Sequence, residues 1–290
     1  MASVVHAFEP VEAIDNMPFG QKCGQHQWTA IILAGERPEG DPLAAHCNVK
    51  YKALIPIAGQ SMLDHVAQAL LASLHIGKIV IMAQSPNALK EAQTSSLEKN
   101  ARVEFVTSNN GIATSIAMVA GSEIAPWPVL VTTADNALLT ADIVDCFLQG
   151  CDDQDVAVGV VERETVMAAY PDTRRTWLKF RGGAYSGANL FALRNAATKP
   201  AIDLWSSVEQ DRKNAWKIFA HFGPWLMFRA ISRTICFEEA MAEAGRRLAL
   251  RAQPVTLPIA EAAIDVDKLC DLKLVGQILS ERNILESNQD

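Results

Sequence analysis

The chain lacks three patterns that mark common protein classes: paired cysteines, apolar runs long enough to cross a membrane, and the glycine motif of Rossmann-type dehydrogenases. None of its six cysteines forms a Cys-x-x-Cys pair, which argues against a zinc site or a disulfide framework and favours reduced thiols in the cytoplasm. No apolar run approaches the roughly 20 residues that cross a bilayer, and no basic and then apolar segment marks a signal peptide. Because no Gly-x-Gly-x-x-Gly follows the first apolar run, a Rossmann-type dehydrogenase is disfavoured.

Positive charge is also scarce. The 290 residues carry a formal net charge of −7, which disfavours nucleic acid as a partner. A ligand with phosphate groups would therefore depend on local basic residues rather than on the field of the whole protein. The length suits one large α/β domain or two small ones.

What the sequence does contain is an alternation of strands and helices. It predicts an α/β fold of the Rossmann-like, three-layer αβα kind, with a mostly parallel central sheet. Residues 1–27 show no clear periodicity and are expected to form a tail or arm, and residues 28–290 a single domain. The predicted strands are Thr29–Leu33, Lys78–Met82, Arg102–Val106, Val129–Thr133, Val156–Val161, Leu190–Leu193 and Val255–Leu257. The predicted helices begin at Ser61 and Thr140 or span Asn87–Asn100, Ile112–Ala120, Ala196–Asp211, Phe237–Leu250 and Leu269–Leu279.

A loop with a glycine follows the first predicted strand. Ala34 and Gly35 end the apolar run, Arg37 lies within the loop, and Lys52 precedes the next apolar run. Backbone amides beside a glycine approach a phosphate closely, and basic side chains add charge. A tight β–α turn also explains the glycine, but the basic residues favour a triphosphate site.

Two acidic positions suggest a metal site. Asp135 follows a central apolar strand, where a carboxylate is costly to bury without a cation, and Mg²⁺ prefers carboxylate and phosphate oxygens. Asp265 and Asp267 are separated by one residue, so on an extended chain they point the same way. Capping of a helix or turn is the alternative at each of these positions.

Two further segments have features of ligand-binding turns. Asn109–Gly111 leads into a predicted helix with hydroxyl groups in its first turn, which suits contact with a nucleotide. Residues 174–189 combine four basic residues with a glycine-rich turn beside a predicted strand. This composition indicates a site for a second, phosphorylated substrate, and a solvated basic face is the alternative.

Taken in order, these motifs resemble the MobA-like nucleotidyltransferases, which include molybdenum-cofactor guanylyl- and cytidylyltransferases and sugar-phosphate nucleotidyltransferases. The resemblance covers about residues 28–280. It departs from the usual pattern in the first loop, where many members have Leu-Ala-Gly-Gly with the arginine further on. The nucleotide residues that it implies are Leu33, Ala34, Gly35, Arg37, Lys52, Asn110, Gly111 and Ser115, with Lys52, Arg37 and Asp135 as the catalytic set. The implied metal residues are Asp135, Asp265 and Asp267, and the implied acceptor residues are Arg175, Lys179, Arg181, Ser186, Gly187 and Asn189.

The reaction implied by the resemblance is Mg²⁺-dependent attack of an acceptor phosphate on the α-phosphorus of an NTP, with pyrophosphate leaving. CTP or GTP is the expected nucleotide, and the expected acceptor is a phosphorylated small molecule or a lipid-linked one. A catalytically silent nucleotide-binding regulator on the same fold is the alternative. Retention of Lys52, Asp135, Asp265 and Asp267 argues against that alternative.

Residues 214–230 interleave Trp and Phe with Lys and Arg, inside an aromatic-rich helical insertion expected at about residues 212–236. This composition suits a bilayer interface, where aromatic rings lie at headgroup depth, and would allow peripheral membrane contact. A helical hairpin in the core or a homodimer interface explains the same composition.

Overall fold

The computed structural model describes residues 27–36, 40–91, 95–109, 111–151, 153–210 and 222–287. Almost all of the predicted arm, residues 212–221 of the expected insertion, and the predicted site residues Arg37 and Asn110 lie outside the described residues. The division into arm, domain and insertion stays a prediction. None of the described helices is both long enough and apolar enough to cross a membrane.

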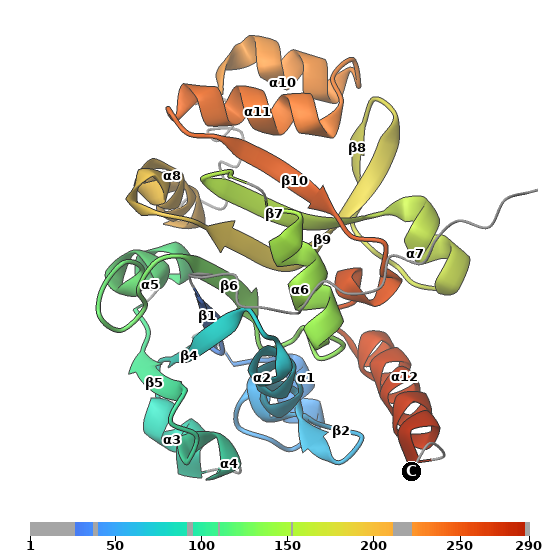
Figure 1. Cartoon of the computed structure of the whole chain (residues 1–290). Coiled ribbons are helices and arrows are strands. Elements are labelled where there is room, and N and C mark those ends of the chain that lie inside the picture. Colours follow the sequence, from blue (N-terminus) through green and yellow to red (C-terminus); the bar gives the residue numbers. More distant parts are fainter. Residues whose placement is uncertain are drawn as a thin grey trace, which may run out of the picture.

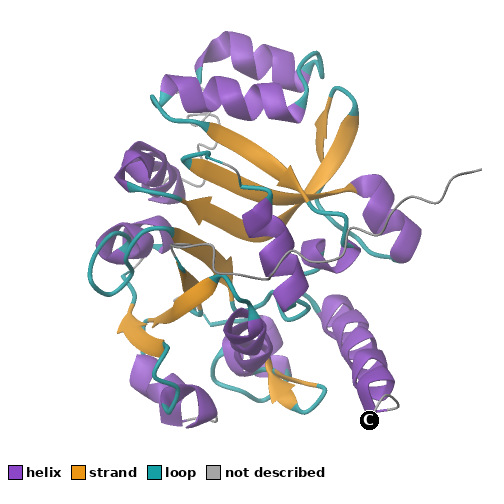
Figure 2. Ribbon diagram, in the orientation of Figure 1, coloured by secondary structure: helices purple, strands orange, loops and turns teal. Residues whose placement is uncertain are grey.

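An eight-stranded, mostly parallel sheet forms the centre of the molecule (Figure 1, Figure 2). Its strand order is β10-β7-β9-β6-β1-β4-β5, with β8 paired to β9 off this path. Among the described strands of this sheet, only β9 runs against the others. The strands are β1 (Trp28–Leu33), β4 (Ile76–Ala83), β5 (Val103–Thr107), β6 (Val129–Thr133), β7 (Val156–Glu162), β8 (Leu178–Phe180), β9 (Gly183–Leu193) and β10 (Ala252–Thr256), and β2 (Pro56–Ile57) and β3 (Gln60–Ser61) form a separate pair.

Helices cover both faces of the sheet, which gives the three layers that the sequence predicts. Ala30 and Ile32 of β1 pack with α2, α3 and α6 on one face, whereas Ile31 packs with α5 and α8 on the other. Because β1 is buried on both faces, its sequence is a continuous apolar run rather than an alternating one. The helices are α1 (Pro42–His46), α2 (Met62–Ala72), α3 (Pro86–Glu91), α4 (Ser95–Glu98), α5 (Ile112–Val119), α6 (Ala141–Gln149), α7 (Arg163–Ala169), α8 (Lys199–Gln210), α10 (Gly223–Ile231), α11 (Phe237–Arg247) and α12 (Leu269–Ser287), with 3₁₀ turns η1 (Lys52–Leu54), η2 (Ala196–Thr198) and η4 (Ala260–Ala263).

The predicted starts of two helices are confirmed. Ser61 Oγ accepts a hydrogen bond from Asp64 N at 3.1 Å at the start of α2, and Thr140 Oγ1 accepts one from Ile143 N at 3.2 Å at the start of α6. The helical spacing of Met62, Leu63, Val66, Leu70 and Leu74 predicts a buried stripe, and the first four of these residues are buried. Leu74 is 85% exposed because the helix stops at Ala72 and Leu74 lies in the following turn.

Two predicted elements differ in extent. The exposed helix expected over residues 87–100 is two short helices, α3 and α4, separated by residues 92–94, which are not described. The strand expected at Leu190–Leu193 is the last part of the much longer β9. Local composition could not show this, because β9 is defined by pairing with both β6 and β7.

Candidate active site

A cavity of about 420 Å³ lies beyond the carboxyl ends of β1, β4, β5 and β6. Each of these strands delivers the residues that follow it to the cavity wall, and η1 and the segment before α12 contribute from elsewhere in the chain. This is the edge at which ligands bind in parallel α/β sheets. The predicted site residues that line the cavity are Leu33, Ala34, Gly35, Lys52, Gly111, Ser115, Asp135 and Asp267.

Gln84 fixes the backbone of the first loop from the neighbouring strand. Its Nε2 donates to Glu36 O at 3.0 Å, and its Oε1 accepts from Glu36 N at 2.8 Å. A Cβ on Gly35 would lie 3.1 Å from Gln84 Nε2, closer than ordinary van der Waals contact, so glycine permits this approach. The sequence prediction missed Gln84. Its position directly after β4, at the same edge as Gly35, is the signal that could have identified it.

Glu36 places a carboxylate in the loop that the sequence assigns to phosphate. Burial raises the pKa of Glu36, while the backbone amide of Lys52 and the ammonium of Lys50 act in the opposite direction. One of its carboxylate oxygens, Oε1, is buried and has no hydrogen-bond partner among the described residues. A phosphate bound here would therefore depend strongly on nearby cations. The contribution of Arg37 to that balance stays a prediction.

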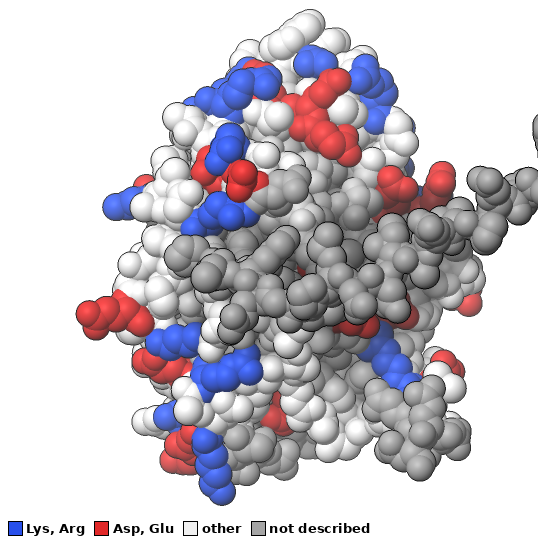
Figure 3. Space-filling view, viewed as in Figure 1, with Lys and Arg blue, Asp and Glu red and all other residues white. Residues whose placement is uncertain are grey.

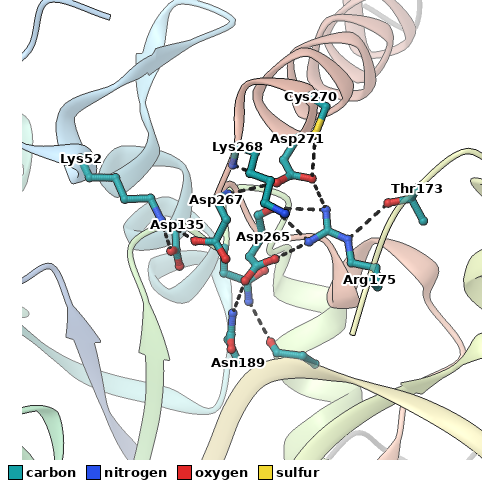
Figure 4. A network of polar contacts seen from close by, with 12 residues as sticks. Lys52, Asp135, Thr173, Arg175, Asn189, Asp265, Asp267, Lys268, Cys270 and Asp271 are labelled. Carbon is teal, nitrogen blue, oxygen red and sulfur yellow. Dashed lines mark hydrogen bonds and ion pairs between the residues drawn. The ribbon is translucent and has the colours of Figure 1, made fainter. Parts of the chain in front are cut away.

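Lys52 joins two acidic segments that are far apart in the sequence (Figure 4). Its Nζ donates to Asp135 Oδ2 at 2.7 Å and to Asp267 Oδ1 at 2.8 Å. Burial disfavours the ammonium form, but the attraction of the two carboxylates outweighs burial and raises the pKa of Lys52. Lys52 is therefore charged at neutral pH, and the structure brings three of the predicted residues together around one point.

Backbone pairing explains why the late aspartates lie beside β6. Val266 N donates to Asp135 O at 3.0 Å, and the side chain of Val266 is buried against α12. Burial raises the pKa of Asp265, and the carboxylates of Asp267 and Asp135 raise it further, against the opposing effects of Arg175 and Asn189. Asp265 is therefore close to Asp135 and Asp267, but its side chain bonds Arg175 and Asn189 rather than Lys52.

The sequence predicts that Arg175 binds an acceptor phosphate, but in the structure its guanidinium is paired with two carboxylates. Its side chain is only 7% exposed and lies between two carboxylates: Nη1 pairs with Asp265 Oδ1, and Nη2 pairs with Asp271 Oδ1 at 2.8 Å. Asn189 Nδ2 donates to the second oxygen of Asp265 at 3.2 Å. Arg175 is therefore held in the interior between Asp265 and Asp271, where it orients the carboxylate of Asp265 (Figure 4).

Asp271 belongs to this cluster and was not predicted. Its Oδ2 accepts from Lys268 N at 2.9 Å and from Asp267 N at 3.3 Å, and these bonds cap the start of α12. The capping role that was the alternative for the two earlier aspartates is thus carried out by Asp271. Its position in the first turn of the predicted final helix is the signal that could have identified it.

Ser115 lies at the cavity but is engaged with its own loop. Its Oγ donates to Gly111 O at 2.6 Å and accepts from Asn109 N at 2.9 Å, and the side chain is buried. It therefore holds the turn that leads into α5. Asn110, which lies in this turn between Asn109 and Gly111 and which the sequence predicts to contact the nucleotide, is outside the described residues.

The other predicted acceptor residues are spread along the hairpin of β8 and β9. Ser186 and Gly187 pair with β7, and neither lines the cavity. Lys179 and Arg181 lie at β8, also away from the cavity lining, and Arg181 Nη2 pairs with Glu239 of α11 at 3.0 Å. Because β8 extends toward α10 and α11 (Figure 1), the basic residues of this hairpin do not gather at the carboxyl edge of the sheet.

The acidic cluster has the donor chemistry of a site for a hard divalent cation. Asp135 Oδ1 is buried with no hydrogen-bond partner among the described residues, and the carboxylates of Asp265 and Asp267 lie near it. Within the described ranges, no three His, Cys, Asp or Glu side chains already form a metal-ligand group. The ammonium of Lys52 is bound by two of the three carboxylates, so a cation would need to share them with it or displace it.

Comparison with known proteins agrees with this architecture. The sequence model of the family described as MobA-like NTP transferase domain matches residues 30–249 of this chain. A hypothetical transferase from Thermus thermophilus is 26% identical, with a TM-score of 0.72 over 85% of this chain and 99% of that one. No curated protein matches the chain significantly in sequence.

Two more distant structures show the same fold. CMP:2-keto-3-deoxy-manno-octonic acid synthetase complexed with CTP is 14% identical, with a TM-score of 0.52 over 88% of this chain and 99% of that one. 4-Diphosphocytidyl-2C-methyl-D-erythritol synthase from Anaerococcus prevotii is 9% identical, with a TM-score of 0.53 over 89% of this chain and 100% of that one. The Rossmann-like, three-layer αβα fold with a mostly parallel sheet, which the sequence predicts, is thereby confirmed.

Proposed function

Because the chain belongs to the MobA-like NTP transferase family and is a nucleotidyltransferase, we propose that it transfers an NMP group from a Mg²⁺-bound NTP to a phosphorylated acceptor. The acceptor is a small molecule or a lipid-linked phosphate, and pyrophosphate is the second product. The observation that carries this proposal is the convergence of Lys52, Asp135 and Asp267 at the carboxyl edge of the sheet, inside the cavity.

Asp135, together with Asp265 or Asp267, would hold the Mg²⁺ ion. When bound, the ion would neutralise charge on the phosphate oxygens of the nucleotide. Asp135 Oδ1, which has no hydrogen-bond partner among the described residues, and the nearby carboxylates of Asp265 and Asp267 favour the arrival of a cation. The phosphates of the nucleotide would supply the ligands that the chain does not.

The chain's own residues would bind and orient the two substrates. In the loop that Gln84 fixes, the backbone amide of Gly35 would face the triphosphate, since the amides of Ala34 and Glu36 are already donated to Met82 O and Gln84 Oε1. Lys52 would stabilise the negative charge that develops on the leaving pyrophosphate, with Arg37 as a second cation. Asn189, which bonds Asp265, would lie on the acceptor side of the acidic cluster. In this arrangement the protein acts by positioning and charge neutralisation rather than by covalent catalysis.

CTP is the first nucleotide to test and GTP the second. Two proteins with the same fold carry cytidine nucleotides in their names, one of them bound to CTP. Ser108, Asn109 and Gly111, at the end of the cavity that follows β5, are the residues expected to lie near the base. The cytoplasmic location expected from the sequence stays a prediction.

The test is a pyrophosphate-release assay with each of the four NTPs against phosphorylated sugars, polyols and cofactor precursors, with Mg²⁺ and with EDTA. Asp135→Ala should lower turnover by at least ~10²-fold, since it removes a preorganised charge stabiliser. Asp203→Ala, on the exposed surface of α8, is the matched control and should retain full turnover. Equal turnover of Asp135→Ala and the control, or turnover that survives EDTA, would overturn the proposed site.

A further inference from the structure

We propose that the exposed face of α10 is a docking surface for an anionic lipid membrane. This surface consists of Trp225, Phe228 and Ile231, which are 66%, 60% and 74% exposed. It goes beyond the proposed nucleotidyl transfer, because it lies at the β10 side of the sheet, away from the cavity (Figure 1).

The three side chains share one face of α10 because they are three residues apart. The rings of Trp225 and Phe228 stack, with centroids 5.9 Å apart and planes 20° from parallel. Leu226 is 7% exposed, so the opposite side of the helix packs against the protein. The interpretation of residues 214–230 as a helical hairpin in the core is therefore wrong for Trp225 and Phe228, since both face outward.

The surroundings of this face are mixed in charge but net basic, although the protein as a whole is acidic. The neighbouring helix α11 carries Glu238, Glu239 and Glu243 together with Arg246 and Arg247. Residues 222–234 contain Arg229 and Arg233 and no Asp or Glu, and the neighbouring residues 178–183 contain Lys179 and Arg181 and no Asp or Glu. The nearby Glu239 of α11 is paired with both Arg181 and Arg229. Figure 3 shows an uncharged surface at the top of the molecule with both basic and acidic side chains beside it.

Aromatic rings next to arginines match the chemistry of an anionic bilayer surface. Trp and Phe rings partition to the headgroup region, and each nearby cation adds attraction to acidic lipids. A nine-residue helix with three inserted side chains would lie on the membrane rather than cross it.

A second copy of the chain fits this surface less well, for two reasons. Three large side chains at this exposure offer on the order of 400 Å², about half of what each partner contributes to a standard protein interface. A twofold contact through α10 would also bring Arg229 and Arg233 of both copies into one interface. A membrane of acidic lipids has neither problem.

The test is co-sedimentation of the full chain with two kinds of vesicle, phosphatidylcholine alone and phosphatidylcholine with about one-third phosphatidylserine. We expect binding to the anionic vesicles, which weakens in about 0.5 M NaCl because salt screens the arginines. Trp225→Ala with Phe228→Ala should lower the affinity at least ~10-fold, since both rings lose their burial in the interface. The double change Arg229→Gln, Arg233→Gln should abolish the preference for phosphatidylserine.

Leu74→Ala is the matched control, because Leu74 is an even more exposed apolar residue away from α10. It should bind vesicles as the wild type does. Circular dichroism and pyrophosphate release without lipid should be unchanged in all variants, which separates loss of docking from loss of folding or of the proposed reaction. Absence of wild-type binding to anionic vesicles would overturn the inference. It would equally be overturned by a dimer in analytical ultracentrifugation that the Trp225→Ala, Phe228→Ala variant abolishes.

Discussion

Replacing Arg175 by leucine should destabilise the protein by about 3 kcal/mol. Removing one member of a buried ion pair typically costs about 3–5 kcal/mol, because the remaining charge is left without compensation. Here two carboxylates lose their partner at once: Asp271, with a side chain 10% exposed, and Asp265, at 26%. The partial exposure of Asp265 lets water replace some of the lost contact, which places the expected cost at the lower end of the range.

The assay is urea unfolding followed by fluorescence and circular dichroism, with the free energy of unfolding taken from the linear extrapolation. For a slope of about 3 kcal/mol per molar, the midpoint should fall by about 1 M. Combining Arg175→Leu with Asp271→Asn should cost less than the sum of the two single changes, since they share one interaction. Arg181→Leu is the matched control, because its side chain is 57% exposed and its pair with Glu239 should contribute at most about 1 kcal/mol. If Arg175→Leu and Arg181→Leu cost the same, the assignment of Arg175 to a buried cluster is wrong.

Two further predictions address the first loop and the acid stability of the sheet edge. Gln84→Leu should raise the KM for the NTP about 10-fold with less effect on kcat, because it removes both hydrogen bonds to the backbone of Glu36. The measurement is steady-state kinetics, with Gln60→Ala at an exposed position as the control. The amide of Arg251 lowers the pKa of Asp155 below its ordinary value of 3.8, so the stabilisation from Asp155 is complete above that pH and is lost as the pH falls through the lowered pKa. The difference in free energy of unfolding between wild type and Asp155→Asn should therefore be constant at neutral pH and shrink in acid, and a constant difference down to pH about 3 would contradict this.

The sequence places several of its candidate residues at one edge of the sheet, where they do line the cavity, by a rule about strand ends. Gly35 and Asp135 each follow an apolar run, and parallel strands bring their carboxyl ends to one edge. Lys52 and Asp267 were predicted from residue type, and the structure brings them to the same cavity. Strand and helix positions were predictable for a similar reason, since apolar periodicity and capping residues act locally.

The parts that were not predictable depend on contacts between distant segments. Nothing near Arg175 in the sequence shows that Asp265 and Asp271 will surround it, and a basic residue in a basic segment suggests a ligand site. Gln84 has no recognisable motif, because its role arises from a loop about fifty residues earlier. The long antiparallel β9 was missed because strand pairing on both sides, rather than composition, extends it.

The hydrogen bond from Val266 to Asp135 has a consequence for how the protein is made. The first strands, the glycine loop and Lys52 leave the ribosome early, but the acidic cluster stays incomplete until a segment some 130 residues after Asp135 has been synthesised. During that interval Asp135 and Lys52 can pair with each other, while Asp265 and Asp267 are absent. A nascent chain that has folded its sheet would thus have most of the cavity wall but not the full acidic cluster, and the proposed activity would require the segment with Asp265 and Asp267 to have been synthesised.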